Sequence, residues 1–391
     1  MKVLIALTYY RPHTSGLTIY AERLARALAE RGHRVTVLTS QYDKSLPQNE
    51  HLHGVDVVRV PVALRISKGV IMPTFGAVAW RMVRAHDVIS LHLPQFDASG
   101  LAGRGRLLKK PVVLTYHCDL QLPPGVFSRV VDRVVFASNV LAARFADRIV
   151  AYTQDYATHS PFMSRYLSKV EVIPPPVHIA TPSAAEVAAF KAKWQLDGQR
   201  VIGFAARLAT EKGVEVLLDA LPHILQQHPN TRVLFAGPHQ HVLGEDAYAR
   251  RVLPLIQAFP NHWTFLGTLN PPDMGAFFSS CDVTVLPSLN STESFGLVQV
   301  EGMLCGTPSI ASALPGVRQP VMMTGMGEIV PIGDSAALAE AVIRVLNDRA
   351  RYVRPRSDIE ALFSTARTAE LYERLFEDLR GRKPHYALRN A

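Results

Sequence analysis

Short apolar runs alternate with amphipathic stretches along the whole chain. In the first half, the apolar runs lie near residues 3–7, 35–39, 56–60, 87–91, 111–115, 148–152 and 170–173. In the second half, they lie near residues 201–205, 231–236, 263–266, 282–286, 308–311 and 328–331. Strands that alternate with helical patterns are typical of parallel sheets joined by crossover helices. The pattern therefore predicts an α/β fold built on parallel sheets.

Two helical patterns stand out between and after these runs. The first follows the opening strand, where apolar residues recur at i, i+3, i+4, i+7, i+8 and i+11 from Leu17 to Leu28, and Gly32 ends it. The last covers roughly residues 358–380 and follows Pro355. Both patterns predict amphipathic helices that bury one face.

A proline-rich segment separates the two halves. Residues 172–183 read VIPPPVHIATPS, and three consecutive prolines continue neither a helix nor a sheet. A chain of 391 residues is also too long for one ordinary core. We therefore predict an N-terminal domain over 1–175, a second domain over 176–355 and a terminal segment over 356–391.

Composition fits a folded protein without a membrane span. Hydrophobic residues make up 48% of the chain and charged residues 19%. The opening MKVLIALTYYRPH resembles a buried strand rather than a signal peptide, and no window holds about 18–20 uninterrupted apolar residues. The three cysteines have no metal-ligand spacing, so we expect free thiols in a reducing cytoplasm.

Positive charge is concentrated in the first half. Residues 1–180 hold 22 Lys and Arg against 12 Asp and Glu, a net of +10, whereas residues 181–391 hold 20 against 21, a net of −1. One interpretation is ordinary surface solvation. The other is an anionic partner, such as the inner face of a membrane, a lipid phosphate or an acidic glycan. Nucleic acid is disfavoured, because the charges are scattered and no recognition motif accompanies them.

The segment 287–312 carries the most specific chemistry. Glu293 and Glu301 bracket the turn Ser294-Phe295-Gly296 and the residues Leu297-Val298, directly after a predicted buried strand. A glycine turn that opens a helix at the end of a strand presents free amides and the positive end of the helix dipole, which favours a phosphate. Two carboxylates beside a phosphate make sense if they bind hydroxyls. A nucleotide sugar offers both groups.

The Glu-x7-Glu pattern around Ser-Phe-Gly resembles the donor-site signature of the GT-B glycosyltransferases of family 4. Two further stretches are similar to the same family: residues 10–39, with an opening glycine loop and helix, and FAARLATEKGVEVLLDAL, with an Arg-x4-Lys-Gly grip. The resemblance covers nearly the whole chain. It implies two Rossmann-like, doubly wound domains with an interdomain cleft, and a C-terminal helix that crosses back to the first domain.

The second domain would hold the donor. Arg207 and Lys212 follow a strand, and two cations there suit a diphosphate, whose charge grows as it leaves. The resemblance assigns the sugar hydroxyls to Glu293, the ribose to Glu301 and the phosphates to the amides of Ser294, Phe295, Gly296, Leu297 and Val298. No Asp-x-Asp pair occurs, so we expect no metal, with the two cations and the helix amides in its place.

The first domain would supply the remaining contacts. Gly16 stands in the first loop, where family members usually have two glycines that let the backbone approach the diphosphate; here the pair is Ser15-Gly16. His117 follows a strand, at the edge where open α/β sheets bind ligands, and the resemblance places it near the transferred sugar. A structural histidine is the alternative. His13 and Asp119 are further candidates for the acceptor side.

The resemblance and these residues together predict a hexosyltransferase, and the resemblance alone implies that it retains the anomeric configuration. It would move a hexose from a nucleoside-diphosphate sugar, with UDP-glucose and GDP-mannose as leading candidates, to a hydroxyl of a cell-surface glycan or lipid-linked acceptor. A nonenzymatic sugar-nucleotide sensor and another enzyme on the same fold, such as a nucleotide-sugar epimerase, remain alternatives. A dinucleotide dehydrogenase is disfavoured, because no G-x-G-x-x-G follows a strand.

Overall fold

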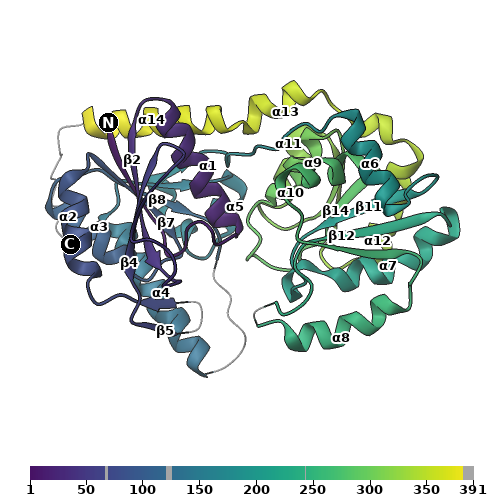
Figure 1. Cartoon of the computed structure of the whole chain (residues 1–391), viewed down its shortest axis with the longest axis horizontal. Coiled ribbons are helices and arrows are strands. Elements are labelled where there is room, and N and C mark those ends of the chain that lie inside the picture. Colours follow the sequence, from purple (N-terminus) through teal and green to yellow (C-terminus); the bar gives the residue numbers. More distant parts are fainter. Residues whose placement is uncertain (67–68, 120–125, 243, 382–391) are drawn as a thin grey trace. The chain divides into compact units, whose positions relative to one another are not determined.

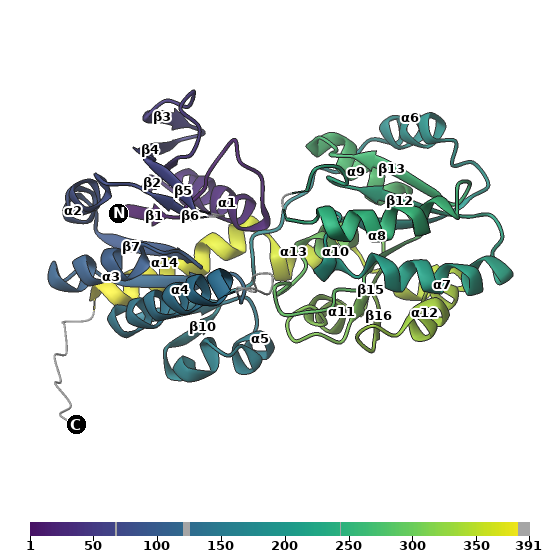
Figure 2. The same ribbon diagram turned by 90° about the horizontal axis from the view of Figure 1, so that it is seen from below.

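The computed structural model describes residues 1–66, 69–119, 126–242 and 244–381. The chain forms two compact units, which Figures 1 and 2 show from two directions. Unit 1 combines Met1–Pro176 with Thr365–Ala391, and unit 2 is Val177–Ser364. Each unit is a twisted sheet with helices on both faces. The predicted α/β fold with two doubly wound, Rossmann-like sheets is therefore confirmed.

Unit 1 is built on an eight-stranded sheet in the order β10-β9-β8-β7-β1-β2-β4-β3. All neighbouring strands are parallel except β3 and β4. The strands are β1 (Lys2–Ala6), β2 (Arg34–Gln41), β3 (Asn49–Leu52), β4 (Val55–Pro61), β7 (Val88–Leu93), β8 (Val112–Tyr116), β9 (Arg148–Ala151) and β10 (Val170–Val172). A separate hairpin pairs β5 (Leu64–Ile66) with β6 (Gly69–Ile71).

The two faces of this sheet differ in chemistry. One face packs an apolar cluster against α2, α3 and α4, whereas the other, beneath α1 and α14, includes buried Ser90, His92, Thr115 and His117. The helices of unit 1 are α1 (Gly16–Glu30), α2 (Phe75–Ala85), α3 (Ala98–Leu107), α4 (Val126–Phe145), α5 (Gln154–His159), the 3₁₀ helix η1 (Met163–Lys169) and α14 (Thr365–Gly381).

Unit 2 is built on a six-stranded, wholly parallel sheet in the order β13-β12-β11-β14-β15-β16. Its strands are β11 (Arg200–Ala205), β12 (Thr231–Ala236), β13 (Trp263–Gly267), β14 (Val283–Leu286), β15 (Ser309–Ser312) and β16 (Gly327–Val330). Its helices are α6 (Ala184–Trp194), η2 (Thr210–Lys212), α7 (Val214–Gln227), α8 (Asp246–Gln257), α9 (Pro271–Ser280), α10 (Leu297–Leu304), α11 (Gln319–Thr324), α12 (Ser335–Asn347), η3 (Arg349–Tyr352) and α13 (Arg356–Phe363).

The thirteen strands expected from the apolar runs are all present within about two residues of their predicted bounds. Three strands escaped the pattern: β3 and the pair β5 and β6. The β3 sequence, NEHL, is largely exposed and polar at a sheet edge, and β5 and β6 have only three residues each. Short or solvated strands lack the apolar alternation on which such a prediction depends.

The single terminal helix predicted near 358–380 is wrong in one respect, because the chain breaks at Ser364. Ser364 is extended (φ −62°, ψ 146°), and the N–H of Val177 donates to the carbonyl oxygen of Phe363 at 2.9 Å. This pairing replaces the continuing helical bond. The result is two helices, α13 in unit 2 and α14 in unit 1.

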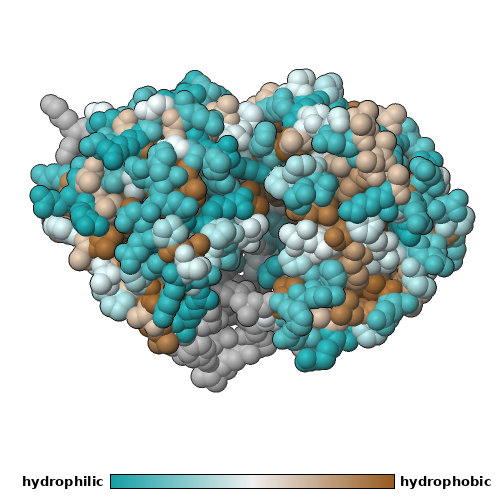
Figure 3. All heavy atoms as spheres, viewed as in Figure 1, coloured by the Kyte–Doolittle hydropathy of each residue, from teal (hydrophilic) through white to brown (hydrophobic). Residues whose placement is uncertain are grey.

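The surface carries scattered apolar side chains. On the face drawn in Figure 3, hydrophobic atoms occur in small patches among hydrophilic ones in both units. Among the helices of the described residues, none is long and apolar enough to cross a bilayer. The three cysteines form no disulfide with one another.

Candidate functional site

In unit 2, the loop after β11 lies tightly against the chain that follows β14. Gly213 has φ +65°, and a Cβ atom there would lie 2.2 Å from the carbonyl oxygen of Pro287. The N–H of Leu289 also donates to the carbonyl oxygen of Glu211 at 2.9 Å. Because only glycine fits both the backbone angle and the space, this residue lets the two loops touch. The contact places Lys212 beside the segment that follows β14.

Lys212 and Glu293, which are 81 residues apart in sequence, form an ion pair. Each side chain is 17% exposed, so water screens the pair less than it screens a surface pair. A turn holds the carboxylate side, with the N–H of Glu293 donating to the carbonyl oxygen of Asn290 at 3.3 Å. The residue predicted for the phosphate and the residue predicted for the sugar hydroxyls are thus direct neighbours.

Arg207 pairs with a residue that the sequence analysis did not single out. Its guanidinium group contacts the carboxylate of Glu211, four residues further along the chain. The arginine side chain is 40% exposed, so several of its five N–H donors still face solvent. Glu211 lies between the two cations of the Arg-x4-Lys motif, and an acidic residue four positions after an arginine is the signal that could have identified it.

The helix α10 begins at a turn that only glycine can make. Gly296 has φ +79°, and a Cβ atom there would lie 2.3 Å from Cδ2 of Leu286 and 2.7 Å from Nε2 of Gln299. The Gln299 side chain locks the turn by donating to the carbonyl oxygens of Phe295 (3.0 Å) and Val317 (2.9 Å). The first amides of a helix lack intrahelical acceptors, so Leu297 and Val298 present N–H groups at its positive end.

The other residues of this segment lie as the sequence suggested. Ser294 and Phe295 are buried, and the ring of Phe295 packs edge-on against Phe363 at 5.6 Å between centroids. Their backbone amides are therefore what they can offer to a ligand. Glu301 is half-buried, one turn into α10, and its neighbours Val300 and Met303 are fully buried.

In unit 1, Gly16 is the first residue of α1. Ser15 caps this helix, because its hydroxyl accepts the N–H of Thr18 at 3.2 Å. A Cβ atom at Gly16 would meet no atom within 4 Å. None of the described residues therefore demands glycine at this position, in contrast to Gly213 and Gly296.

His13 is part of a small aromatic group in the same loop. Its ring stacks on Tyr9 at 4.9 Å and meets Tyr42 edge-on at 5.8 Å. Burial lowers the pKa of His13 below its ordinary value, so the neutral ring is favoured. These ring contacts do not test the role of His13 on the acceptor side, which stays a prediction.

His117 is buried, and both of its ring nitrogens have partners within unit 1. Its Nε2 lies 2.8 Å from Nδ1 of His92, and its Nδ1 contacts the hydroxyl of Tyr152. Burial lowers the pKa of His117 well below its ordinary value, and the adjacent His92 adds to this effect. A ring nitrogen could bond to a sugar only by exchanging one of these partners. Its catalytic role remains a prediction.

Asp119 is held by hydroxyl groups. Its Oδ1 accepts from Tyr116 at 3.0 Å and from Ser160 at 2.7 Å, while its buried Oδ2 has no hydrogen-bond partner among the residues that the structure describes. The contact of Asp119 with the acceptor remains a prediction.

The partners of His117 that the structure reveals, His92 and Tyr152, each lie at a strand end. A histidine in the last residues of β7, close to the level at which His117 follows β8, is the sequence signal that could have identified His92.

Two family profiles match the chain. Residues 14–181 match the family described as Glycosyltransferase Family 4, and residues 187–360 match Glycosyl transferases group 1. The phosphatidyl-myo-inositol mannosyltransferase of Mycobacterium leprae is 28% identical over 375 residues, covering 93% of this chain and 92% of that protein. The D-inositol 3-phosphate glycosyltransferase of Acidothermus cellulolyticus is 30% identical over 370 residues, covering 87% and 80%.

A solved structure shows the same fold. The Anabaena protein Alr3699/HepE in complex with UDP-glucose superposes with a TM-score of 0.76 and 21% identity, covering 97% of this chain and 100% of that chain. At this identity the likeness establishes the fold alone, which is the expected GT-B fold.

The two kinds of glycine predict opposite effects on stability. Gly213→Ala should lower the free energy of unfolding by at least about 2 kcal/mol, because alanine is strained at φ +65° and meets Pro287. Gly16→Ala, the matched control, should raise it by up to about 1 kcal/mol, because alanine fits the start of α1 and restricts the unfolded chain. Urea denaturation of both variants measures this difference. Equal stability of the two variants would show that the loop contact at Gly213 is not tight.

Proposed function

Because this chain belongs to the family 4 glycosyltransferases, we propose that it transfers a hexose from a nucleoside-diphosphate sugar to a hydroxyl of a glycan or lipid-linked acceptor, with retention of the anomeric configuration. The observation that carries this proposal is the joining of Lys212 and Glu293 beside the amino-terminal end of α10. A cation, helix amides and a carboxylate then meet in one place, and a nucleotide sugar requires all three.

The proposed chemistry divides between the phosphate and the sugar. Lys212, Arg207 and the amides from Ser294 to Val298 bind the diphosphate, and Glu293 binds hydroxyls of the hexose. As the bond between the anomeric carbon and the phosphate oxygen breaks, negative charge grows on the leaving group, where the fixed cations stabilise it. The acceptor oxygen bonds to the same carbon on the same face. Its proton passes to the leaving phosphate.

Glu301 and Gly16 complete the proposed donor contacts. Glu301, half-buried on α10, accepts hydrogen bonds from the ribose hydroxyls. The space around Gly16 supports a close approach of its backbone to the diphosphate, since no protein atom occupies the position of its missing Cβ. His117, as a neutral ring, contributes to the sugar site, and His13 and Asp119 belong to the acceptor side. The buried Oδ2 of Asp119, which has no partner within the described part of the chain, supports a hydroxyl ligand there.

The comparisons support candidates for both substrates. The Anabaena structure contains UDP-glucose, and the Mycobacterium leprae relative is named as a mannosyltransferase. We therefore keep UDP-glucose and GDP-mannose as the first donors to test. Both named relatives act on inositol compounds, so acceptor trials should include inositol phosphates and phosphatidylinositol as well as glycans.

For the predicted contact with an anionic membrane, we propose exposed residues of unit 1. Leu64 and Ile71 on the β5–β6 hairpin are 55% and 45% exposed, and Trp80 on α2 is 38% exposed. Arg84 is exposed one turn after Trp80, on the same side of the helix. An aromatic side chain next to a cation is typical of a helix that lies at a membrane surface. We propose Trp80 and Arg84 on α2, at the cytoplasmic side, as the lipid contact, with Leu64 and Ile71 of the hairpin as further candidates.

The donor site is tested first by its cations. Lys212→Ala should lower turnover by at least about 10²-fold, and Arg207→Ala by a smaller factor, because each removes a fixed charge from the leaving group. Slow hydrolysis of a panel of nucleotide sugars measures this effect and identifies the donor before the acceptor is known. Arg251→Ala, which removes an exposed ion pair elsewhere in unit 2, is the control. Near-wild-type turnover in a folded Lys212→Ala protein would contradict the proposed donor site.

Metal independence is a second test. The chain has no Asp-x-Asp pair, and we propose that Lys212, Arg207 and the helix amides neutralise the diphosphate. Hydrolysis and transfer should therefore persist in excess EDTA. A complete loss that Mg²⁺ or Mn²⁺ restores would show that a metal ion does this work instead.

The membrane contact is tested with lipid vesicles. The protein should bind vesicles of phosphatidylserine and phosphatidylcholine more tightly than pure phosphatidylcholine, and less so as salt rises, because the Debye length falls from about 10 Å at 0.1 M to about 3 Å at 1 M. The double variant Trp80→Ala/Arg84→Ala should lose this preference. Leu255→Ala, which removes an exposed apolar residue of unit 2, should keep it. Equal binding to both vesicle types would contradict the membrane contact and leave surface solvation as the interpretation of the positive charge in the first half of the chain.

A further inference from the structure

The face of the unit 1 sheet beneath α1 and α14 contains a buried polar network. His92 from β7, Thr115 from β8, Tyr20 from α1 and Tyr372 from α14 are all fully buried, and His117 and Tyr152 are each 5% exposed. Burying such groups without partners costs about 1–3 kcal/mol each, so their arrangement is strongly determined by hydrogen bonding. Nearly all of the opposite face is apolar.

His117 lies at the centre of this network. The strand continues past β8, because the N–H of His117 donates to the carbonyl oxygen of Leu93 at 3.0 Å. Thr115 and His117 are two residues apart on this extended chain and so share a face. The ring of His117 has His92 on one nitrogen and Tyr152 on the other.

The unpaired nitrogen of His92 indicates how the protons are arranged. Burial lowers the pKa of His92 to about 3, so both rings are neutral and carry one proton each. If His117 donated from Nε2, His92 would carry a proton on a buried Nε2 that has no acceptor among the described residues. Buried N–H groups without acceptors are rarer than buried lone pairs without donors. The favoured arrangement has His92 donating to His117, and His117 donating from Nδ1 to the oxygen of Tyr152.

Tyr372 of the C-terminal helix connects to both sides of this arrangement. Its hydroxyl lies 2.7 Å from Oγ1 of Thr115, two residues before His117, and 2.8 Å from the hydroxyl of Tyr20. The ring of Tyr20 meets His117 edge-on at 4.9 Å between centroids and stacks on Tyr152 at 5.2 Å. One hydroxyl group from α14 thus touches the strand that carries His117 and fixes the ring against which His117 packs.

We propose that Tyr372 is a positioning residue for His117, and that α14 thereby forms part of the site that His117 serves. The hydroxyl holds Tyr20 against the imidazole and keeps His117 as the single Nδ1–H tautomer between His92 and Tyr152. The consequence for catalysis rests on the proposed function, whereas the effect on the imidazole does not.

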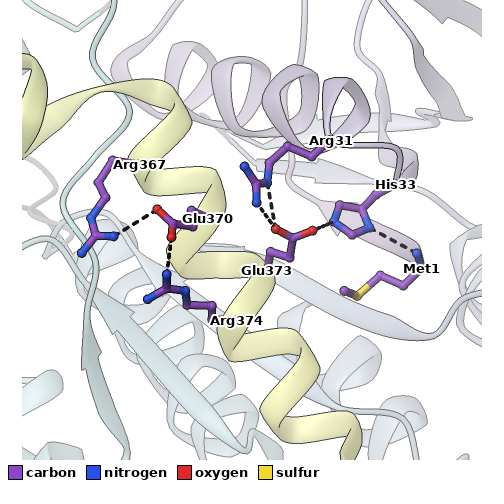
Figure 4. Close-up of polar contacts among 7 residues, drawn as sticks. All are labelled: Met1, Arg31, His33, Arg367, Glu370, Glu373 and Arg374. Carbon is purple, nitrogen blue, oxygen red and sulfur yellow. Dashed lines mark hydrogen bonds and ion pairs between the residues drawn. The ribbon is translucent and has the colours of Figure 1, made fainter.

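Docking of α14 does not by itself explain this hydroxyl. Thr368 donates to the carbonyl oxygen of Pro174 at 2.9 Å. Glu373 binds Arg31 and accepts from His33 at 2.8 Å, and His33 in turn meets the amino group of Met1 at 3.2 Å (Figure 4). These contacts hold the helix on α1 without Tyr372. Phenylalanine would fill the same space, so docking of α14 does not require the hydroxyl of Tyr372.

The test compares substitutions at adjacent positions of one helix. Tyr372→Phe removes the hydroxyl and keeps the ring, and Glu373→Gln weakens docking of the same helix without touching the network. Nitrogen-15 NMR of histidine side chains reports the tautomer of His117, assigned through a His117→Gln variant. Tyr372→Phe should turn the single-tautomer signals into averaged ones. It should also lower kcat for donor hydrolysis between about 10- and 100-fold, with KM and nucleotide affinity unchanged.

Controls separate positioning from stability. Glu373→Gln should keep the wild-type His117 signals and kcat, whatever its melting temperature. Tyr20→Phe should reproduce the Tyr372→Phe effect, and the double variant should add little, because the two hydroxyls act as one unit. Unchanged His117 signals in folded Tyr372→Phe would overturn the proposal, as would equal changes in Glu373→Gln. If the wild-type protein hydrolyses no nucleotide sugar, the proposed function fails while the NMR comparison still decides the positioning role.

Discussion

The candidate donor site depends on the ion pair between Lys212 and Glu293, and that pair depends on two glycines. Gly213 lets the loop after β11 touch the chain after β14, and Gly296 turns that chain into α10. A side chain at Gly213 would meet the backbone of Pro287 at 2.2 Å and separate the two loops, and one at Gly296 would meet the side chains of Leu286 at 2.3 Å and Gln299 at 2.7 Å and disturb the start of α10. The cation, the carboxylate and the positive end of the helix would then no longer share one place.

The pairing also sets the electrostatics of the candidate donor site. Lys212 and Arg207 each have a carboxylate partner, Glu293 and Glu211, so the cations are neutralised before any ligand binds. A diphosphate must compete with these carboxylates, and it brings more charge than either. The partners can then serve another purpose, and for Glu293 we propose the sugar hydroxyls. Preformed pairs of this kind keep long, flexible cations in place at little cost on binding.

In unit 1, most candidate residues are buried, and several lie on a sheet face that contains both polar and apolar side chains. His117 is neutral and held by two partners, so it is suited to acting as a fixed, uncharged hydrogen-bonding group rather than to taking up a second proton during the reaction. The network that holds it includes residues from three strands or strand ends, from α1 and from α14. The C-terminal segment that returns to unit 1 therefore adds Tyr372 to a network whose other members come from the first 176 residues.

How much the sequence could predict follows from the range of the signals. The strands, the helix at Leu17–Leu28 and the turn before α10 were predictable, since apolar periodicity and positive-φ glycines act locally. The ion pair across 81 residues was not, because two separate motifs carry no information about their mutual contact. The break at Ser364 was missed for the same reason, as it depends on a backbone bond from Val177. Tyr372 resembles any core residue of an amphipathic helix until its partners are seen.

We propose that the donor site divides its tasks, with Lys212 binding the diphosphate and Glu293 binding the sugar. Calorimetric binding of the nucleoside diphosphate to Glu293→Gln tests it most directly, with Lys212→Ala beside it. The substitution removes the carboxylate that competes for Lys212, so the affinity of Glu293→Gln for the diphosphate should match or exceed that of the wild type, while hydrolysis of the nucleotide sugar falls. If Glu293→Gln instead loses diphosphate affinity as fully as Lys212→Ala does, Glu293 belongs to the phosphate grip and the division is wrong.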